Sequence, residues 1–337
     1  MKLLNFSLYF GFIRSVFSLS VVFLLFAGRD LRSGAFVPQW AKGKVLRIRS
    51  IVIHRGDVFD LTKQYNLFYA AANALHITTK EFVIRREVLL REGEILDWEL
   101  VEETERNIRA LHFISSCRVE VVPVGRELVD VHIHTRDKFT LRVEVSGSLL
   151  GGVTKGRVSV GERNFLGLGK VVRVTGVKRT DRQYGSIKYE DVHLFGTHHQ
   201  LMAIASRSDV GEKYLLDITR PFWRLDSKWS WGGSFTFERG ESRLYHGGIL
   251  ERTDIPHTKK LGDLFLTHRW GSRWRQPFVG INLSMKEVRY GKAKGEESEK
   301  VRIPPPAVSN TCLLNFGITD LQGYRKLHHL DLQGQVE

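Results

Sequence analysis

The sequence is poor in the features that most often reveal an enzyme or a metal protein. Its 337 residues include two cysteines, Cys117 and Cys312, and no Cys-x-x-Cys spacing, which excludes a disulfide framework, a redox dithiol and a cysteine zinc site. His132 and His134 share one face of a predicted strand but have no third ligand at a convincing spacing. No nucleophile paired with a base and no nucleotide-binding loop is evident. We therefore predict no enzymatic activity, no cofactor and no metal site.

Long apolar runs are also missing. No segment reaches the roughly 20 apolar residues that a membrane-spanning helix needs. The most apolar run, 15–28, follows Lys2 and Arg14 and has the layout of a secretory signal peptide. We predict a signal peptide over 1–28, with a cleavage site as far along as Ala35, and a linker over 29–44. An uncleaved membrane anchor is the alternative.

Positive charge is abundant but not concentrated. The formal net charge is +14, yet the Lys and Arg residues are dispersed through predicted strands and loops and form neither a single run nor a basic helix. This distribution argues against nucleic acid as a partner. Many basic residues stand beside aromatic ones, as in Arg269-Trp270, which suits an anionic lipid surface.

The N-terminal half contains the pattern of one small α+β unit. A β-branched segment predicts a first strand, and two amphipathic segments predict helices, the second capped by Asp97. Thr78 and Thr79 are the predicted caps of the first helix. The predicted elements, in order, are a strand over 45–53, helices over 80–92 and 97–111, and strands over 116–122 and 128–134.

From residue 138 onward, apolar and polar residues alternate with the period of two that strands produce. Val279, Ile281 and Leu283, for example, alternate with Asn282 and Ser284. In a membrane barrel the apolar residues face lipid and the polar residues face a wet lumen. A soluble sandwich has the same period with its apolar face inward, so alternation alone leaves both architectures open.

The segment 160–170 is the most distinctive part of the chain. It lies between two alternating segments, so it predicts the tight turn of a β-hairpin, with Gly167 and Gly169 providing backbone freedom. A phosphate-binding loop is excluded, because such a loop precedes a helix, whereas 171–175 has the composition of a strand. Aromatic residues recur at similar turns at intervals of about 30 residues, the length of one membrane hairpin with its turns.

Several of these segments resemble a known family. Glu162 to Lys170 (Glu-Arg-Asn-Phe-Leu-Gly-Leu-Gly-Lys) is similar to the turn after the second barrel strand in the BamA and TamA superfamily of outer-membrane assembly and translocation proteins. The segment 220–223 (Arg-Pro-Phe-Trp) resembles a later turn of that family, with Arg220 in place of the usual acidic residue. Four phrases, at 75–78, 91–94, 103–106 and 135–137, resemble in order the POTRA domain that directly precedes such a barrel.

The resemblance implies a fold and a function. The implied fold is an α+β POTRA domain of order β-α-α-β-β over 45–137, followed by an antiparallel transmembrane β-barrel over 138–337. The implied function is insertion or translocation of proteins in a bacterial outer membrane, with the POTRA domain in the periplasm. Implied partners are unfolded outer-membrane or secreted client proteins, periplasmic or lipoprotein partners, and outer-membrane lipid.

The resemblance also implies three sets of site residues. The POTRA edge strand would bind a client or partner strand by β-augmentation through Ser116, Cys117, Arg118, Val119, Glu120, Val121 and Val122. The POTRA–barrel junction would consist of Thr135, Arg136 and Asp137. Periplasmic barrel turns would contain Asn164, Phe165, Gly167, Gly169, Pro221, Phe222 and Trp223.

The predicted barrel is short for this family. At about 30 residues per hairpin, 138–337 holds roughly twelve strands, whereas the superfamily's barrel has about sixteen. The chain ends in Gln-Gly-Gln-Val-Glu, without a terminal aromatic residue. We therefore predict an incomplete barrel. The alternatives are a two-partner secretion pore that exports one substrate, and a passive outer-membrane channel that uses its POTRA domain as a docking scaffold.

Overall fold

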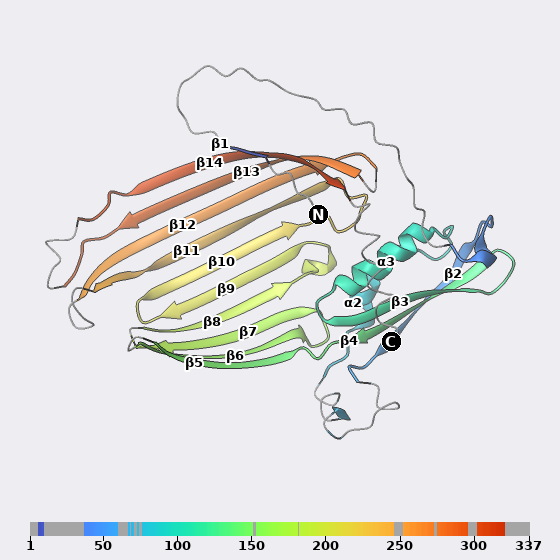
Figure 1. The fold of residues 1–337 in the computed structure, drawn as a ribbon, viewed down its shortest axis with the longest axis horizontal. Helices are drawn as coiled ribbons and strands as arrows, with labels where there is room; N and C mark the ends of the chain where they lie inside the picture. The colour runs from blue at the N-terminus through green and yellow to red at the C-terminus, as the bar shows by residue number, and fades with distance from the viewer. Residues whose placement is uncertain are drawn as a thin grey trace, which may run out of the picture.

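The chain forms two β-sheets in the computed structural model (Figure 1). The structure describes residues 6–9, 37–59, 67, 69–70, 73, 76–150, 153–180, 182–245, 252–272, 275–295 and 302–320. The predicted signal peptide lies outside these residues except for β1 (Phe6–Tyr9), which pairs antiparallel with β14 (Ala307–Asp320). From the predicted linker, 37–44 is described; it includes η1 (Gln39–Ala41), and its Ala41 is buried.

The smaller sheet belongs to a unit that we call the N-terminal unit, residues 37–137. Its sheet order is β2-β4-β3, with β2 parallel and β3 antiparallel to the central β4. Along the chain the order is strand, helix, helix, strand, strand. The bounds are β2 (Arg47–Gly56), α2 (Glu81–Arg85), α3 (Trp98–Ala110), β3 (Ile114–Pro123) and β4 (Leu128–Asp137).

Apolar side chains of α3 and the central strand meet in the core of the N-terminal unit. Val129, Val131 and Ile133 point to one face of β4, as period-two alternation requires, and are fully buried. Ile108 of α3 is fully buried as well. The side chain of Asp97 caps α3 by accepting a hydrogen bond from the backbone N–H of Glu99 at 2.8 Å. The second helix therefore begins at the predicted cap.

The first helix is much shorter than predicted. α2 ends at Arg85, whereas the pattern predicted a helix to residue 92. The segment after it bonds to other elements: the N–H of Leu89 donates to Thr104 Oγ1 at 3.1 Å, and the Glu92 carboxylate accepts from the N–H of Ile51 at 2.8 Å. Thr79, one of the two predicted caps, bonds to Asp137 instead. Tertiary hydrogen bonds thus replace the last helical turns.

The larger sheet, which we call the large sheet, has eleven described strands in the order β1-β14-β13-β12-β11-β10-β9-β8-β7-β6-β5, and the consecutive strands β5 to β14 all pair antiparallel. Ten of these described strands follow residue 138, and β11, β12 and β13 run for 17, 18 and 16 residues, longer than the roughly ten assumed in the prediction of twelve strands over 138–337. Residues 321–337 of that range lie outside the described residues. The remaining bounds are β5 (Leu141–Leu150), β6 (Val153–Phe165), β7 (Lys170–Arg179), β8 (Gln183–Asp191), β9 (Gln200–Ser208), β10 (Gly211–Arg220), β11 (Trp229–Tyr245), β12 (Arg252–Arg269) and β13 (Arg275–Tyr290).

One face of the large sheet is apolar and exposed; we call it the outward face. Strand pairing aligns its residues, since Val143 lies opposite Val160 and Phe235 opposite Leu216. These four side chains are 46–63% exposed, and the same face continues through further half-exposed or largely exposed residues. The others include Val145, Val158, Val174, Ile187, Tyr214, Trp231, Leu264, Leu266, Ile281, Leu283, Met285, Leu314 and Phe316.

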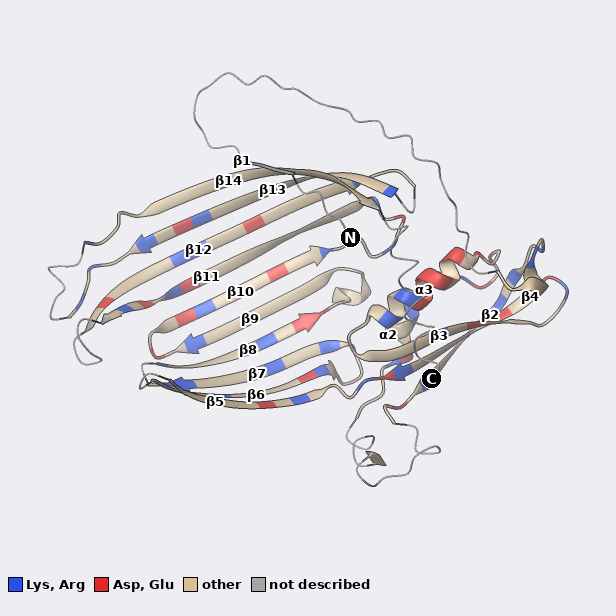
Figure 2. Cartoon of the chain, viewed as in Figure 1, with Lys and Arg blue, Asp and Glu red and all other residues tan. Residues whose placement is uncertain are grey.

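The opposite face of the large sheet is rich in polar groups. Ser159 and Thr175 are buried there, with their hydroxyls 3.0 Å apart on neighbouring strands. Asp263 accepts a hydrogen bond from Ser284 Oγ at 2.6 Å. Lys and Arg residues are spread over both units and interleaved with acidic residues (Figure 2). Within the described residues, no helix has the length and apolarity to cross a membrane.

Candidate functional site

The N-terminal unit docks against one end of the large sheet (Figure 1). Most of the predicted junction and turn residues lie at this contact. Three connections of the sheet take part: the β6–β7 turn, the β8–β9 connection with η2 (Leu194–Gly196), and the β10–β11 connection. We call them the three docking turns.

A buried polar chain joins the end of β4 to the β6–β7 turn. The carboxylate of Asp137, 1% exposed, accepts hydrogen bonds from the N–H and hydroxyl of Thr79 at 2.7 and 2.8 Å, and His76 Nε2 lies 2.9 Å from it. The amide of Asn164 then donates to the Thr79 hydroxyl at 2.9 Å and accepts from the N–H of Gly169 at 2.7 Å. Two predicted site residues, Asp137 and Asn164, are therefore linked through Thr79, which the sequence marked only as a helix cap.

Both predicted turn glycines are required by the docking. Gly167 and Gly169 have φ values of 73° and 70°, in the left-handed region that favours glycine. The carbonyl of Gly167 accepts a hydrogen bond from the N–H of Lys80 at 2.8 Å. A Cβ on Gly169 would lie 2.7 Å from the ring of Phe113, a fully buried residue of the N-terminal unit. Phe165, also predicted, is 42% exposed.

The β10–β11 connection contacts α3. The backbone carbonyl of Trp223 accepts a hydrogen bond from the Asn107 amide at 3.3 Å, and the buried Glu103 carboxylate accepts one from the N–H of Leu225 at 2.6 Å. The predicted residues Pro221, Phe222 and Trp223 are partly buried. The Arg269 guanidinium lies 4.1 Å from the centre of the Phe222 ring.

The other two predicted junction residues lie within the N-terminal unit. Thr135 is buried, and its hydroxyl donates to the carbonyl of His54 at 3.4 Å. The carbonyl of Arg136 accepts from Ser115 Oγ at 3.0 Å. These two hydrogen bonds fix the end of β4, and Asp137 at that end is linked through Thr79 to the β6–β7 turn.

β3, which contains the predicted binding strand 116–122, is an edge of the three-stranded sheet. Its exposed side chains include Ser116, Arg118 and Glu120, while Val119 and Val121 are half-buried. Val122 is also half-buried. The thiol of Cys117 is buried, which raises its pKa to about 12 and makes it a poor nucleophile at neutral pH.

One backbone group of this edge already has a partner. The N–H of Val119 donates to the Glu105 carboxylate of α3 at 3.0 Å, so it points away from β4. Because N–H groups of a strand alternate in direction, those of Cys117 and Val121 point the same way. An added strand would therefore meet the outward N–H groups of Cys117, Val119 and Val121, of which the middle one is bonded to Glu105.

His132 and His134 lie on one face of β4, as their spacing predicted. His54 of β2 stacks between them: its ring centre is 5.3 Å from that of His132 and 4.5 Å from that of His134. His54 Nε2 lies 3.0 Å from His132 Nδ1. No local spacing indicates the third histidine, because His54 and His132 are 78 residues apart in the sequence.

The sequence also failed to indicate the residues that connect the β8–β9 connection to the N-terminal unit. Glu87 and His193 are both buried, with the Glu87 carboxylate 2.6 Å from His193 Nε2, across 106 residues of sequence. His112 is a further contact: its Nε2 lies 2.9 Å from the Arg163 carbonyl, and burial lowers its pKa. No local spacing predicts such contacts, because each partner comes from a different unit.

Comparisons with known proteins found a relative by sequence and several solved structures that are similar to this chain. No family model matches the chain. A curated protein named "Putative outer membrane protein assembly factor", from Treponema pallidum (strain Nichols), is 26% identical over 126 residues, or 35% of this chain. That match spans 15% of the relative's length.

Among solved structures, BamA from Haemophilus ducreyi lacking POTRA domains 1–3 has a TM-score of 0.40 at 12% identity, over 75% of this chain and 56% of that one. CdiB from Escherichia coli has a TM-score of 0.41 at 12% identity, over 82% of this chain and 42% of that one. The sequence relative confirms the predicted resemblance: this chain is similar to an outer-membrane protein assembly factor.

Proposed function

We propose that this chain is an outer-membrane assembly or translocation factor of the BamA and TamA type. In this proposal the N-terminal unit is a POTRA domain in the periplasm, the large sheet is the membrane-embedded barrel wall, and the three docking turns lie at the periplasmic end. The clients are unfolded outer-membrane or secreted proteins. The relative's printed name supports the proposal, although the chain spans 15% of that protein's length.

The single observation that carries the proposal is the inverted polarity of the large sheet. In water, burial of apolar side chains drives folding, and a face lined by residues such as Trp231, Phe235 and Leu264 would be costly to leave exposed. In a bilayer the same face contacts hydrocarbon, while Ser159, Thr175 and other polar groups face a wet interior. The polarity therefore suits membrane strands and is unsuited to a soluble sandwich.

The edge strand β3 supplies the client-binding step in this proposal. An extended client strand would pair with the outward backbone groups of Cys117, Val119 and Val121. Main-chain hydrogen bonds make little demand on client sequence, which suits a factor that handles many unfolded proteins. Glu105 must release the Val119 N–H before a full ladder forms, so its contact protects the edge when no client is present.

A depletion experiment tests the function as a whole. The chain is depleted in its own organism, and outer-membrane proteins are quantified by mass spectrometry. General loss of outer-membrane barrels is the expected result. Loss of a single exported protein would replace the proposal with a dedicated secretion pore. Unchanged protein content with altered solute uptake would replace it with a passive channel.

A proline substitution tests the edge. Val121→Pro removes one outward N–H and leaves the ladder to β4 intact, because proline is tolerated where the N–H faces away from the sheet. A photoreactive group at Glu120, which is exposed, should cross-link an unfolded outer-membrane barrel protein diluted from urea. We expect Val121→Pro to abolish this cross-link and Val121→Ala, which keeps the N–H, to retain it. Equal cross-linking by both variants would contradict β-augmentation at β3.

A further inference from the structure

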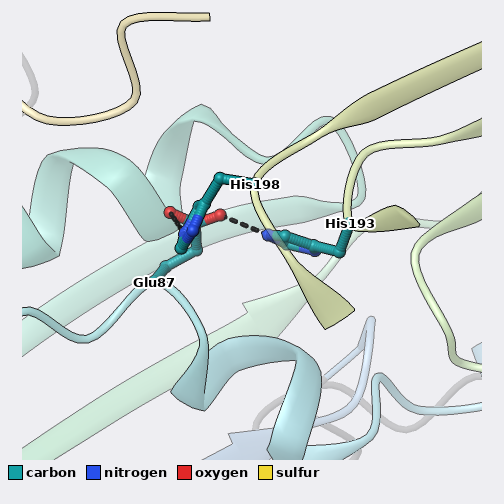
Figure 3. Close-up of side chains that lie close together, drawn as sticks. All are labelled: Glu87, His193 and His198. Atoms are coloured by element: carbon teal, nitrogen blue, oxygen red, sulfur yellow. Dashed lines mark hydrogen bonds and ion pairs between the residues drawn. The ribbon is translucent and has the colours of Figure 1, made fainter. Parts of the chain in front are cut away.

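Three potential metal ligands converge where the β8–β9 connection meets the N-terminal unit (Figure 3). Glu87 follows α2, whereas His193 and His198 flank η2. One ligand atom from each lies within 4.8 Å of the others. His193 Nε2 is 2.6 Å from Glu87 Oε1, and His198 Nε2 is 4.0 Å from Glu87 Oε2.

The cluster is mostly buried, and some of its nitrogen atoms have no hydrogen-bond partner. The side chains of Glu87 and His193 are 10% and 3% exposed, and that of His198 is 20% exposed. Within the described part of the chain, His198 Nε2 and His193 Nδ1 are buried without a hydrogen-bond partner. A buried polar atom without a partner costs about 1–3 kcal/mol. The hydrogen bond between His193 and Glu87 does not involve His198. It therefore leaves His198 Nε2, which lies 4.0 Å from the Glu87 carboxylate, without a partner.

The surroundings hold His198 in place. Its ring stacks on the Trp223 indole, with ring centres 3.6 Å apart and an interplanar angle of 12°. This contact orients the ring so that its Nε2 lies 4.0 Å from the Glu87 carboxylate.

We propose that Glu87, His193 and His198 form a binding site for a divalent transition metal, with zinc as the best fit. Two imidazole nitrogens and one carboxylate oxygen are a recurrent zinc ligand set, and a water would complete four-coordination. Tetrahedral ligands about 2.0–2.1 Å from zinc are about 3.4 Å from one another. One ligand atom from each of the three residues lies within 4.8 Å of the others, so shifts of about 1–1.5 Å bring the set to that spacing.

The position of the site gives the metal a structural role. Glu87 belongs to the N-terminal unit, and both histidines belong to the large sheet, so a bound ion would cross-link the two units. Zinc would then fix the orientation of the N-terminal unit relative to the sheet. This inference is independent of the proposed transport function, since it rests on the three side chains and their burial alone.

The experiment uses the full chain in detergent, without a polyhistidine tag, after removal of metals with a chelator. Zn²⁺ alone is titrated by equilibrium dialysis, and bound metal is counted by elemental mass spectrometry. We expect one saturable zinc per chain, and His198→Ala should weaken its affinity at least about 100-fold. His198 is chosen because its Nε2 lies 4.0 Å from the Glu87 carboxylate, beyond hydrogen-bond distance, so its removal breaks no hydrogen bond to Glu87. His199→Ala, which alters a neighbour outside the cluster, is the matched control and should bind zinc as the unaltered chain does.

Two further readouts separate a metal site from a buried hydrogen bond. Co²⁺ in the site should show the visible absorption of tetrahedral coordination, and this signal should vanish in His198→Ala. Zinc should also raise the melting temperature of the unaltered chain and of His199→Ala but leave that of His198→Ala unchanged. Absence of stoichiometric zinc from the unaltered chain, or equal binding by His198→Ala, would overturn the proposal, and the cluster would then be a proton-sharing Glu–His pair.

Discussion

The N-terminal unit and the large sheet arrange the same residue types in opposite ways. Val131 of β4 is fully buried, whereas Val145 of β5 is 75% exposed, although each stands in a strand with alternating apolar residues. In the N-terminal unit the apolar face meets α3 and forms a core, whereas most of the buried side chains described in the large sheet are polar. The comparison teaches that alternation specifies a strand but not which of its faces is covered by protein.

The largest expected difference comes from removing one aromatic ring in each region. Phe113→Ala opens a cavity in the core of the N-terminal unit and should lower its free energy of unfolding by about 3–5 kcal/mol. Phe235→Ala, at a site that is 50% exposed on the outward face, should cost at most about 1.5 kcal/mol in detergent. Hydrogen exchange of peptides covering β4 and β11 measures the two regions separately. Equal losses would remove the distinction between them.

A charge on the outward face sharpens the comparison. Phe235→Arg would place a guanidinium in hydrocarbon and should destabilise the sheet in lipid vesicles by about 2–4 kcal/mol if the position lies near the bilayer midplane. Ser234→Arg is the matched control, because its neighbour Asp263 on the polar face can pair with the new cation, and should cost less than about 1 kcal/mol. Folding yield into vesicles over a urea series is the measurement. Equal tolerance of both variants would show that the outward face does not contact lipid.

A third change addresses the contact between the two regions. Asn164→Ala removes the group that links Thr79 to Gly169, leaving the buried N–H of Gly169 without its acceptor and the Thr79 hydroxyl without the donor from Asn164. It should weaken the docking by about 1–3 kcal/mol. Phe165→Ala, at the exposed neighbouring position, should have little effect. Exchange rates of the amides of Lys80 and Gly169 report the opening of the turn. If both variants exchange at the same rate, the polar chain does not hold the turn in place.

The smallest expected effect is a pH dependence confined to the N-terminal unit. Hydrogen bonds from Arg49 and Ser50 lower the pKa of Asp130 to about 2. A carboxyl whose pKa falls on folding stabilises the fold above its unfolded pKa of about 3.9 and loses that contribution as the pH falls through the folded value. We expect the melting temperature of the unaltered unit to exceed that of Arg49→Gln at pH 5 and the difference to shrink toward pH 2. A constant difference over this range would show that Asp130 is not the group responsible.

Local patterns in the sequence were sufficient to predict much of the fold. The cap at Asp97 and the amphipathic face containing Ile108 depend on neighbours within a few residues, and both are found where they were predicted. The turn predicted over 160–170 is confined to 166–169, because β6 continues to Phe165. The helix predicted to continue to 92 was wrong because Leu89 and Glu92 bond to α3 and β2. Such bonds depend on tertiary partners that no local period contains.

The candidate site divides in the same way. Gly167 and Gly169 were predicted as turn glycines, but their close approach to Thr78 and Phe113 is visible only once the two units are docked. Glu87 and His193 were not predicted at all, because their contact spans 106 residues and neither stands in a metal-binding motif. The sequence therefore predicts the turns, and the docked structure supplies their partners.

The most direct test of the central claim is a measurement of which face of the large sheet contacts lipid. In a chain carrying Cys117→Ala and Cys312→Ser, single cysteines at positions 281, 282, 283 and 284 of β13 receive spin labels, and the chain is reconstituted into vesicles. We expect labels at 281 and 283 to collide with lipid-soluble oxygen, whereas labels at 282 and 284 should collide with a water-soluble nickel complex. Equal access of the nickel complex to all four positions would contradict a membrane-embedded outward face.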